Sequence, residues 1–596
     1  MRSIIIRSLT FITAIYFIVS GCAKMNTPSG GPKDKEIPVI LKSAPKNGAV
    51  NFRNKEVVIY FDEYVVLDRI SEKFMVSPPM KKRPDVFTRG KSIHIKFDEE
   101  LRENATYTFY FQDAIRDLNE GNIINNYQFV FSTGPVIDSL SVTGNVCSGL
   151  SLDPPENAMS LLYSQLADSS VIRHLPDYIT RAEKNGEFRI SNVRPGKYRL
   201  YALVDGDNSK NYNNRDEQFA FSPESVDITP EKNFLPLVKD TAVIKPVNGK
   251  IPFKPPVIGE YQLIMFQEEK KARYLTSSSR KQPYKLTYTL SLPPDSLKFD
   301  FIIPGVTAKA YYIEQTKNRD TISIWLTDSS VYNRPQIETI VKFPFTDSLG
   351  ILSQKTDTIQ MRYLAPRVPR SKAVKRTPYK ISTGISGQVR PDKKIVITAP
   401  TPFSPPDTSK ILFYELIKDK KIRHPFKLLR DTANSCRYLV HTELIPGKSY
   451  LFINDSAAFS SIYGEFSDST GSRFSVLAPE SYGKLIVDIS GYDGDRIIQL
   501  LSNTEKLVRE IYNKGNIKVE FPLLEKGTYR LRVIFDLNND GKWTTGNFDT
   551  HRQPEPVSYY PEELEIKENW VVTQPWLLEL KNYKNPKMQV IPKSTK

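Results

Sequence analysis

The sequence predicts an all-β protein, built as a tandem array of β-sandwich domains. Aromatic residues are abundant, with 31 Tyr and 31 Phe among 596 residues, and many short runs alternate Tyr, Phe, Val or Ile with polar residues. Such runs are typical of pleated, half-buried strands. Proline is also frequent, at 43 residues. At about 100–150 residues per domain, a chain of this length holds roughly four or five domains.

The first 36 residues have the pattern of a targeting segment followed by a tether. Two arginines precede an apolar run over residues 8–19, which is shorter than the ~20 residues of a membrane-spanning helix. Val-Ser-Gly-Cys at 19–22 resembles a lipobox, in which the thiol of Cys22 accepts diacylglycerol. The alternative is an ordinary secretory signal with an accidental cysteine. We expect a signal peptide over 1–21, lipidation of Cys22 and a flexible tether over 22–36.

Residues 37–134 contain the clearest module. Val-Val-Ile-Tyr-Phe at 57–61 predicts a strand, and Ser-Ile-His-Ile-Lys-Phe at 92–97 alternates apolar with polar residues. Together with Asn-Ala-Thr-Tyr at 104–107 and Phe-Val-Phe-Ser-Thr-Gly at 129–134, this order resembles the bacterial Ig-like domain of the S-layer-protein type. The resemblance implies a seven-stranded sandwich, a fold that serves many functions and establishes none.

A second module occurs twice. Within residues 135–240, Pro-Gly-Lys-Tyr at 195–198 resembles the last hairpin of the transthyretin-like, carboxypeptidase-regulatory-like sandwich. Lys-Gly-Thr-Tyr at 526–529 repeats it, and in both copies the glycine precedes a loop aspartate by nine positions. We therefore expect an internal repeat, with a second transthyretin-like domain over 479–596.

A fainter repeat links the first module to residues 381–478. Tyr107 precedes Phe131 by 24 residues, and Tyr450 precedes Phe474 by the same interval. We expect a diverged Ig-like domain there.

The two remaining segments carry weaker signals. Residues 241–370 include strand patterns such as Tyr-Gln-Leu-Ile-Met-Phe at 261–266, so we expect a β-sandwich of unassigned type. The following residues, 371–380, are rich in Lys and Arg and are expected to form a basic linker.

The best candidate site follows the second copy of the repeat. Asp536, Asn538 and Asp540 alternate along a short loop, and a glycine follows. With the backbone carbonyl of Lys542 as fourth ligand, this is the front half of an EF-hand-type calcium loop, although position twelve is Asn547 and not Glu. The alternative is a simple turn, which Asn, Asp and Gly also favour.

The first copy of the repeat carries a weaker version of this loop. Asp205, Asp207 and Ser209 take the equivalent places, but the glycine at position six is missing. Calcium at either loop would rigidify the backbone and perform no chemistry. No other cofactor is expected.

The sequence contains no pattern typical of an enzyme. Its five histidines are scattered without zinc-ligand spacing, and no nucleophile elbow, phosphate loop or dinucleotide fingerprint occurs. Besides Cys22 there are only Cys147 and Cys436, which exclude a disulfide framework. Trp543, Trp570 and Trp576 could offer a surface for stacking on sugars, but core packing is the commoner role of tryptophan.

These observations favour a binding or structural protein. The order of modules resembles Ig-like-domain lipoproteins of certain Gram-negative bacteria, but this resemblance leaves the biochemical role undefined. From the expected lipid anchor and the array of sandwiches, we expect an outer-membrane scaffold that docks an envelope protein. The alternative is a surface adhesin or glycan-binding protein. The net charge of +16 could attract anionic headgroups or acidic glycans, whereas nucleic acid is not expected. No acidic residue follows Cys22 directly, which favours the periplasmic face over the cell surface.

Overall fold

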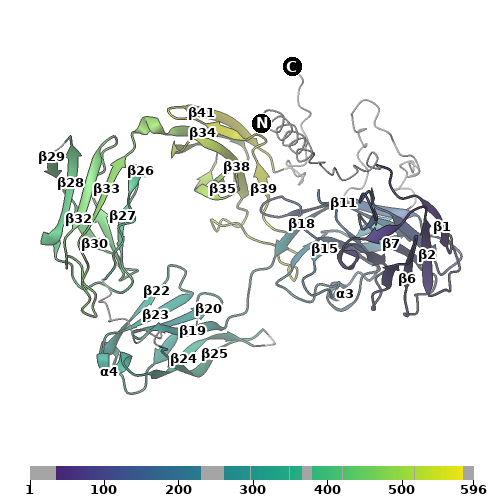
Figure 1. Cartoon of the computed structure of the whole chain (residues 1–596), viewed down its shortest axis with the longest axis horizontal. Helices are drawn as coiled ribbons and strands as arrows, with labels where there is room; N and C mark the ends of the chain where they lie inside the picture. Colours follow the sequence, from purple (N-terminus) through teal and green to yellow (C-terminus); the bar gives the residue numbers. More distant parts are fainter. Residues whose placement is uncertain are drawn as a thin grey trace, which may run out of the picture. The chain divides into compact units, whose positions relative to one another are not determined.

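A computed structural model of the protein describes residues 35–229, 261–364 and 379–580, except residues 295–296, 348–349, 419 and 516. The expected signal peptide and Cys22 lie outside the described residues, as do most of the tether and most of the basic linker. Strands dominate the described chain, and its α-helices are single turns of four or five residues (Figure 1). The protein is therefore all-β, as its sequence predicts.

The described residues form two compact units. The first holds the residues up to Met265 without the short segments 147–153 and 214–218, and the second holds those segments and the residues from Phe266 onward. Each unit contains separate hydrophobic cores, two in the first and three in the second. No helix among the described residues is long and apolar enough to cross a membrane.

The first sandwich has a core of aromatic and β-branched side chains. Its elements are β1 (Ile40–Ala44), β2 (Glu56–Phe61), β3 (Val65–Leu67), α2 (Ile70–Lys73), β4 (Met75–Ser77), β5 (Asp85–Thr88), β6 (Ser92–Lys96), β7 (Thr106–Tyr110), β8 (Ile115–Asp117), β9 (Ile123–Ile124) and β10 (Gln128–Ser132). The sheet orders are β1-β2-β6-β5, β10-β7-β4 and β3-β8-β9. Alternation along β2 buries Val57, Ile59 and Phe61, which pack in one core with Phe109 and Phe131.

The second sandwich follows directly. Its elements are β11 (Leu140–Ser148), β12 (Met159–Tyr163), α3 (Ser169–Arg173), β13 (Tyr178–Arg181), β14 (Glu187–Val193), β15 (Gly196–Val204), β16 (Gln218–Phe221), β17 (Val226–Ile228) and β18 (Tyr261–Gln267). The strand order is β13-β12-β15-β16-β18-β11-β14, and β17 pairs with β15. Leu200, Ala202 and Ile190 lie in its core.

Strand β18 corrects a boundary expected from the sequence. The sequence placed residues 261–266 in the segment 241–370, but β18 lies between β16 and β11, and Leu263 and Met265 belong to the second core. The backbones approach closely there, because a Cβ atom added at Gly144 would lie 2.1 Å from the carbonyl oxygen of Tyr261. The boundary at residue 240 was therefore wrong, since strand pairing across a long chain interval leaves no local signal.

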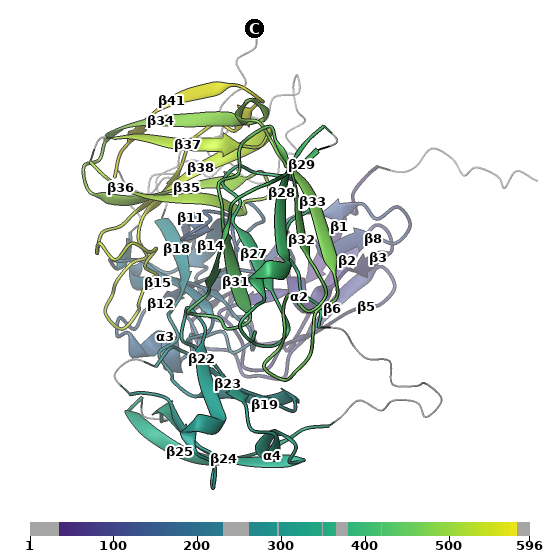
Figure 2. The ribbon, with the colours of Figure 1, turned by 90° about the vertical axis from the view of Figure 1, so that its left-hand side faces the viewer.

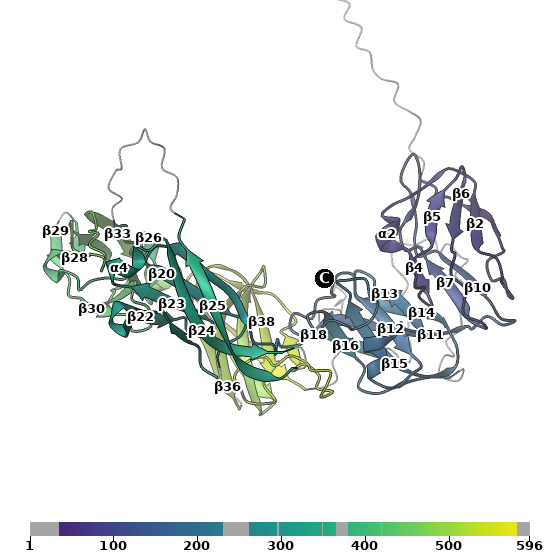
Figure 3. The same ribbon diagram turned by 90° about the horizontal axis from the view of Figure 1, so that it is seen from below.

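Buried polar contacts join the first two sandwiches within the first unit. The hydroxyl of Ser77 accepts the N–H of Ile179 at 3.1 Å, and the hydroxyl of Thr108 accepts the side-chain amide of Asn192 at 2.8 Å. The phenol of Tyr110 accepts a third hydrogen bond at 3.3 Å, and burial raises its pKa to about 12. Figure 3 shows β4 and β7 beside β13 and β14, the strands that carry most of these residues.

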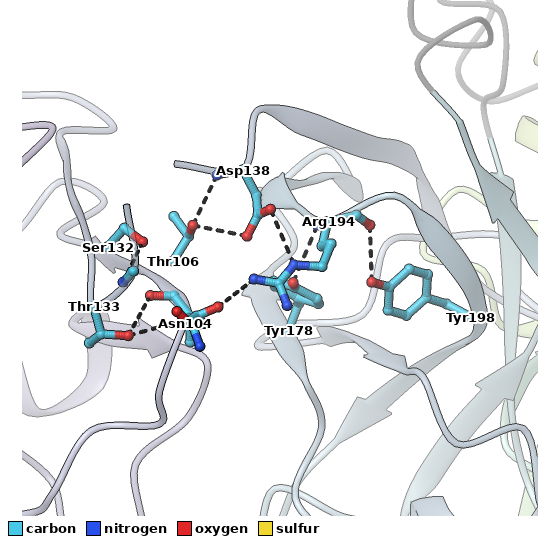
Figure 4. Close-up of polar contacts among 10 residues, drawn as sticks. Asn104, Thr106, Ser132, Thr133, Asp138, Tyr178, Arg194 and Tyr198 are labelled. Atoms are coloured by element: carbon cyan, nitrogen blue, oxygen red, sulfur yellow. Dashed lines mark hydrogen bonds and ion pairs between the residues drawn. The ribbon is translucent and has the colours of Figure 1, made fainter. Parts of the chain in front are cut away.

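A second polar group closes the same junction at its margin (Figure 4). Asp138 accepts a hydrogen bond from the hydroxyl of Thr106 at 3.0 Å and forms an ion pair with Arg194 at 3.4 Å. Arg194 also donates to the backbone carbonyl of Asn104 in the first sandwich. The two sandwiches are thus fixed to each other by both buried and half-exposed polar groups.

The third sandwich begins the second unit. Its elements are β19 (Leu275–Gln282), β20 (Lys285–Leu290), β21 (Asp300–Ile302), η2 (Ala308–Ala310), β22 (Tyr311–Gln315), β23 (Thr321–Leu326), α4 (Ser329–Tyr332), β24 (Gln336–Thr346) and β25 (Leu352–Arg362). The sheet orders are β19-β20-β23-β22 and β21-β24-β25. Leu286, Ile324 and Val341 from both sheets lie in one core.

The fourth sandwich shares part of the strand pairing of the first. Its elements are β26 (Gly387–Val389), β27 (Ile395–Thr398), η3 (Thr408–Lys410), β28 (Ile411–Ile417), β29 (Lys420–Arg423), β30 (Lys427–Arg430), β31 (Arg437–His441), β32 (Ser449–Asn454) and β33 (Thr470–Val476). The sheet orders are β26-β33-β32-β28-β29 and β27-β31-β30. Tyr450 pairs directly with Phe474, as Tyr107 pairs with Phe131, which explains the equal 24-residue intervals.

The fifth sandwich repeats the strand order of the second. Its elements are η4 (Pro479–Ser481), β34 (Gly483–Gly491), β35 (Asp495–Ser502), β36 (Leu507–Lys514), β37 (Lys518–Leu524), β38 (Gly527–Phe535), β39 (Val557–Tyr559), β40 (Leu564–Ile566) and β41 (Val571–Leu578). The orders are β37-β34-β41, visible in Figure 2, and β36-β35-β38-β39, with β40 paired to β38. Each strand from β34 to β41 thus has its counterpart from β11 to β18, so the two sandwiches share one order of strands.

Candidate functional site

Two equivalent strands place the two candidate loops. Strands β15 and β38 each have nine residues and begin at the glycine of the repeat, and each is followed at once by the first aspartate of its loop. The repeat tyrosines anchor both strands in the same way, because Tyr198 donates to the carbonyl of Arg194 at 3.0 Å and Tyr529 to that of Glu525 at 2.8 Å. The spacing seen in the sequence therefore reflects a shared local structure.

The Asp536 loop is a compact turn held by its own side chains. The buried carboxylate of Asp536 accepts the N–H groups of Asp540 at 3.1 Å and Gly541 at 2.8 Å. Asn538 accepts the N–H of Asp540 at 3.0 Å, and Asp540 accepts that of Lys542 at 2.8 Å. Asp536, Asn538 and Asp540 thus lie together, as the sequence predicts, and each already has a backbone partner.

Glu555 also holds this loop, although no motif in the sequence singles it out. Its carboxylate accepts the N–H of Leu537 at 2.8 Å and that of Thr544 at 2.9 Å, and it is only 5% exposed. Burial raises the pKa of Glu555. Glu555 lies 19 residues after Asp536, outside any twelve-residue loop, so no motif spacing could have identified it.

The Asp205 loop has the same backbone form. Asp205 accepts the N–H groups of Ser209 at 3.2 Å and Lys210 at 2.8 Å, four and five positions later, as Asp536 does in its own loop. Asp207 accepts the N–H of Ser209 at 2.9 Å, and hydrogen bonds from Ser209 lower its pKa. Oxygen atoms of Asp205 and Asp207 lie within 4.8 Å of one another.

The missing glycine of the Asp205 loop does not change its backbone. Lys210 occupies the place of Gly541, and its φ of 59° is close to the 73° of that glycine. Asn208 and Asn539, two positions earlier, also have positive φ values, of 64° and 59°. The missing glycine was therefore a poor reason to consider the Asp205 loop weaker. The hydrogen bonds of Asp205 hold Lys210 in a left-handed conformation, which lysine rarely adopts alone.

Both loops could hold a calcium ion through oxygen atoms. A carboxylate oxygen that accepts one N–H retains a further lone pair, so the hydrogen bonds within each loop do not exclude a ligand. Asp536, Asn538 and Asp540 would hold the ion, with the carbonyl of Lys542, in the fifth sandwich. Asp205, Asp207 and Ser209 would hold it in the second. The same hydrogen bonds also form a complete turn without an ion. Both interpretations of the sequence, a calcium loop and a simple turn, therefore fit this geometry.

Other residues singled out in the sequence take separate places. Trp576 is 5% exposed and lies in the fifth core, whereas Trp570 is 54% exposed and lies under the ammonium of Lys567. Trp543 donates to the carbonyl of Glu555 at 3.1 Å and therefore supports the Asp536 loop. The three tryptophans thus have three different environments.

Neither of the two described cysteines is part of a disulfide. Cys147 is buried, and Cys436 is partly buried. Burial raises the pKa of Cys436 to about 11, which keeps its thiol protonated at neutral pH.

One set of side chains resembles a nucleophile, a base and an acid. On the first sandwich, His94 Nδ1 lies 2.8 Å from Glu56 Oε1, and His94 Nε2 lies 3.1 Å from Ser92 Oγ. The hydroxyl of Ser92, however, donates to the carbonyl of Arg89 at 2.7 Å. Its proton is thus directed away from His94, and the set has the geometry of a hydrogen-bonded row across neighbouring strands.

Comparison with known proteins identifies two segments. Residues 34–133 match the family model described as bacterial Ig-like domain, and residues 169–213 match the one described as polysaccharide lyase family 4, domain II. The second match lies inside the segment that resembled transthyretin-like domains and carries a different family description. No curated protein matches the chain.

Solved structures with partial similarity include the S-layer protein rSbsC(31-844), at 10% identity over 86% of this chain and 65% of that chain, with a TM-score of 0.13. Bacteroides ovatus SGBP-B in complex with mixed-linkage heptasaccharide is 8% identical over 72% of this chain and 94% of that one, with a TM-score of 0.17. Native alpha-2-macroglobulin from Escherichia coli, spanning domains MG0-NIE-MG1, is 12% identical over 49% of this chain and 96% of that chain, with a TM-score of 0.18.

Proposed function

Because this chain is a bacterial Ig-like domain protein, with that domain at residues 34–133, we propose that it is a non-catalytic scaffold of the cell envelope, anchored in the outer membrane through Cys22. The observation that carries the proposal is the tandem array itself. The described residues form successive sandwiches, each with its own core and with polar loops at its ends. Such arrays suit spacing and docking, since binding residues are commonly displayed on loops of a rigid framework.

The anchor can be tested directly. Cells are grown with a labelled fatty acid, and the chain is compared with a Cys22→Ala variant and with Cys147→Ala as a control that keeps the lipobox. We expect label and membrane fractionation for the chain and for Cys147→Ala, and the loss of both for Cys22→Ala. Membrane retention of an unlabelled Cys22→Ala variant would contradict the lipid anchor.

The side of the membrane is a second question. We propose the periplasmic face, because no acidic residue directly follows Cys22. Protease is added to intact and to lysed cells, and degradation of the fifth sandwich is followed. Protection until lysis is expected. Degradation in intact cells would place the array at the cell surface.

A surface adhesin or glycan-binding protein is the second candidate. It is supported by Trp570, whose ring is 54% exposed and lies 4.8 Å from the ammonium of Lys567. An exposed indole face can stack on a sugar ring. A glycan array probed with the chain and with Trp570→Ala tests this candidate, and binding that survives the substitution would argue against Trp570 as the contact.

A further inference from the structure

In the fourth sandwich, cationic and apolar side chains are interleaved along the consecutive strands β29 and β30, each of which lies at the end of its own sheet. We call this surface the basic edge. It comprises Ile417, Lys418, Lys420, Lys421, Ile422, Arg423, Lys427, Leu429 and Arg430. All of these side chains are exposed. They belong to the end of β28, the hairpin that follows it, β29 and β30.

Strand β29 is an addition to the pattern shared with the first sandwich. In the first sandwich, β4 leads to β5 without an intervening strand, whereas in the fourth β29 lies between the equivalent strands β28 and β30. It pairs with β28 alone and ends its sheet, with Ile417 opposite Lys420 and Tyr414 opposite Arg423. The first sandwich therefore has no strand equivalent to β29 and no counterpart of the basic edge.

The cations of the basic edge have no anionic partner among the residues that the structure describes. None of its six Lys and Arg side chains forms an ion pair or hydrogen bond with another described residue. The nearby carboxylates of Glu415 and Asp431 are already paired with Lys448, at 2.7 Å, and Arg437, at 4.0 Å. Asp419 is the one acidic residue in the sequence from 417 to 430. The edge therefore carries a concentrated positive charge.

The apolar side chains of the basic edge are exposed as well. Ile417, Ile422 and Leu429 are 45%, 49% and 49% exposed. Lysines on an edge strand have a common explanation, because charge discourages pairing with another chain. That explanation does not cover the three exposed aliphatic side chains among the same residues, which would increase the tendency to associate. A partner that accepts both kinds of side chain accounts for both.

We propose that the basic edge docks on an anionic lipid surface. Phosphate headgroups would neutralise the six cations, and the aliphatic side chains of Ile417, Ile422 and Leu429 would enter the boundary between headgroups and acyl chains. An acidic polysaccharide or nucleic acid would satisfy the cations but offers no acyl region for the aliphatic side chains. The combination therefore favours lipid over a soluble polyanion.

The test uses the chain from residue 22 onward without acyl chains, so that its outcome does not depend on the proposed anchor. Binding is measured by sedimentation with vesicles of phosphatidylcholine alone or with about one third phosphatidylglycerol. A charge variant carries Lys420→Gln, Lys421→Gln and Arg423→Gln, and an apolar variant carries Ile417→Ser, Ile422→Ser and Leu429→Ser. The control carries Lys298→Gln, Lys309→Gln and Lys317→Gln, an equal loss of charge on exposed positions of the third sandwich.

We expect binding to the anionic vesicles that weakens with salt, falls roughly tenfold or more in the charge variant, falls clearly in the apolar variant and is retained by the control. Far-ultraviolet circular dichroism verifies that each variant is folded. No preference for anionic vesicles, or equal weakening in the control, would overturn the proposal. It would also be overturned if the apolar variant bound normally while soluble dextran sulfate displaced the chain, because the surface would then recognise polyanions and not lipid.

Discussion

Several aspartates in this chain are placed to accept backbone N–H groups within turns. Asp117, Asp205 and Asp536 each accept N–H groups of residues four and five positions later. A carboxylate that receives such hydrogen bonds fixes the conformation of the turn. At the residue scale, these aspartates therefore set loop geometry whether or not an ion is bound.

Asp117 is the clearest test of this role. Burial favours its neutral form, but the N–H groups of Gly121, Asn122 and Glu120 outweigh burial and lower its pKa. The Asp117→Asn variant loses the charge and part of the accepting capacity, so its free energy of unfolding should fall by about 1–3 kcal/mol at neutral pH. Urea unfolding measures the change.

The pH dependence of this effect has a definite sign. Because folding lowers the pKa of Asp117 below its usual value of 3.8, its stabilisation is present above about pH 4 and is lost as the pH falls through the folded value. The stability difference between the chain and Asp117→Asn should therefore shrink below pH 4. A difference that stays constant down to pH 2 would contradict this account.

Calcium at the Asp536 loop is a second prediction at this scale. An ion that binds only the folded chain at 100 times its Kd stabilises by about 2.7 kcal/mol. We expect calcium to raise the temperature of the unfolding transition of the fifth sandwich in the unchanged chain but not in Asp540→Ala, whereas Glu562→Gln, an exposed change in the same sandwich, should respond normally. The absence of any shift with millimolar calcium would leave the loop as a turn alone.

At the scale of elements, the first and the fourth sandwich each contain a tyrosine that links a strand to the loop before it. The hydroxyl of Tyr107 accepts the N–H of Arg102 at 2.9 Å, and that of Tyr450 accepts the N–H of Ile445 at 2.9 Å. Each ring also stacks on its cross-strand phenylalanine, at 5.4 Å for Phe131. The hydroxyl and the ring together fix the strand and the loop before it.

Removal of one such hydroxyl gives a matched test. Tyr450→Phe keeps the ring stacking but loses the acceptor for Ile445, and should cost about 1 kcal/mol of unfolding free energy. Tyr414→Phe removes a half-buried hydroxyl on β28 that has no hydrogen bond among the described residues, and should cost much less. Equal effects in chemical denaturation would mean that the Tyr450 hydrogen bond contributes nothing.

The junction of the first two sandwiches provides another test between elements. Ser77→Ala removes the acceptor of the buried N–H of Ile179 and should cost about 1–3 kcal/mol. Ser160 is its control, since its buried hydroxyl has no partner among the described residues, so Ser160→Ala should be neutral or stabilising. A similar loss in both variants would indicate that packing, and not this hydrogen bond, determines the effect.

At the scale of the whole molecule, stability is divided among separate cores. The first two cores are joined by buried polar contacts, whereas each of the other sandwiches has a core of its own. We expect calorimetry to show more than one unfolding transition, with the first two sandwiches melting together and a van't Hoff enthalpy below the calorimetric one. A single transition with equal enthalpies would show instead that the whole array unfolds as one cooperative unit.

The all-β class, the Ig-like module and both repeats could be predicted from local patterns in the sequence. Alternation in runs such as 56–61 is a local property, and equal intervals such as Tyr107 to Phe131 reflect pairs of strands that keep their register. The candidate loops were found for the same reason, since turns are held by residues a few positions apart. Local chemistry therefore accounts for what the sequence could predict.

Three features could not be predicted in this way: β18 completes the second sandwich, Glu555 holds the Asp536 loop, and β29 adds the basic edge to the fourth sandwich. Each of these depends on groups that are distant in sequence and meet only when strands pair across long intervals. The left-handed backbone of Lys210 belongs with them, because the carboxylate of Asp205 imposes a conformation that lysine itself disfavours. The type of side chain sets the local backbone preference of a residue. The contacts that override this preference form only in the folded chain.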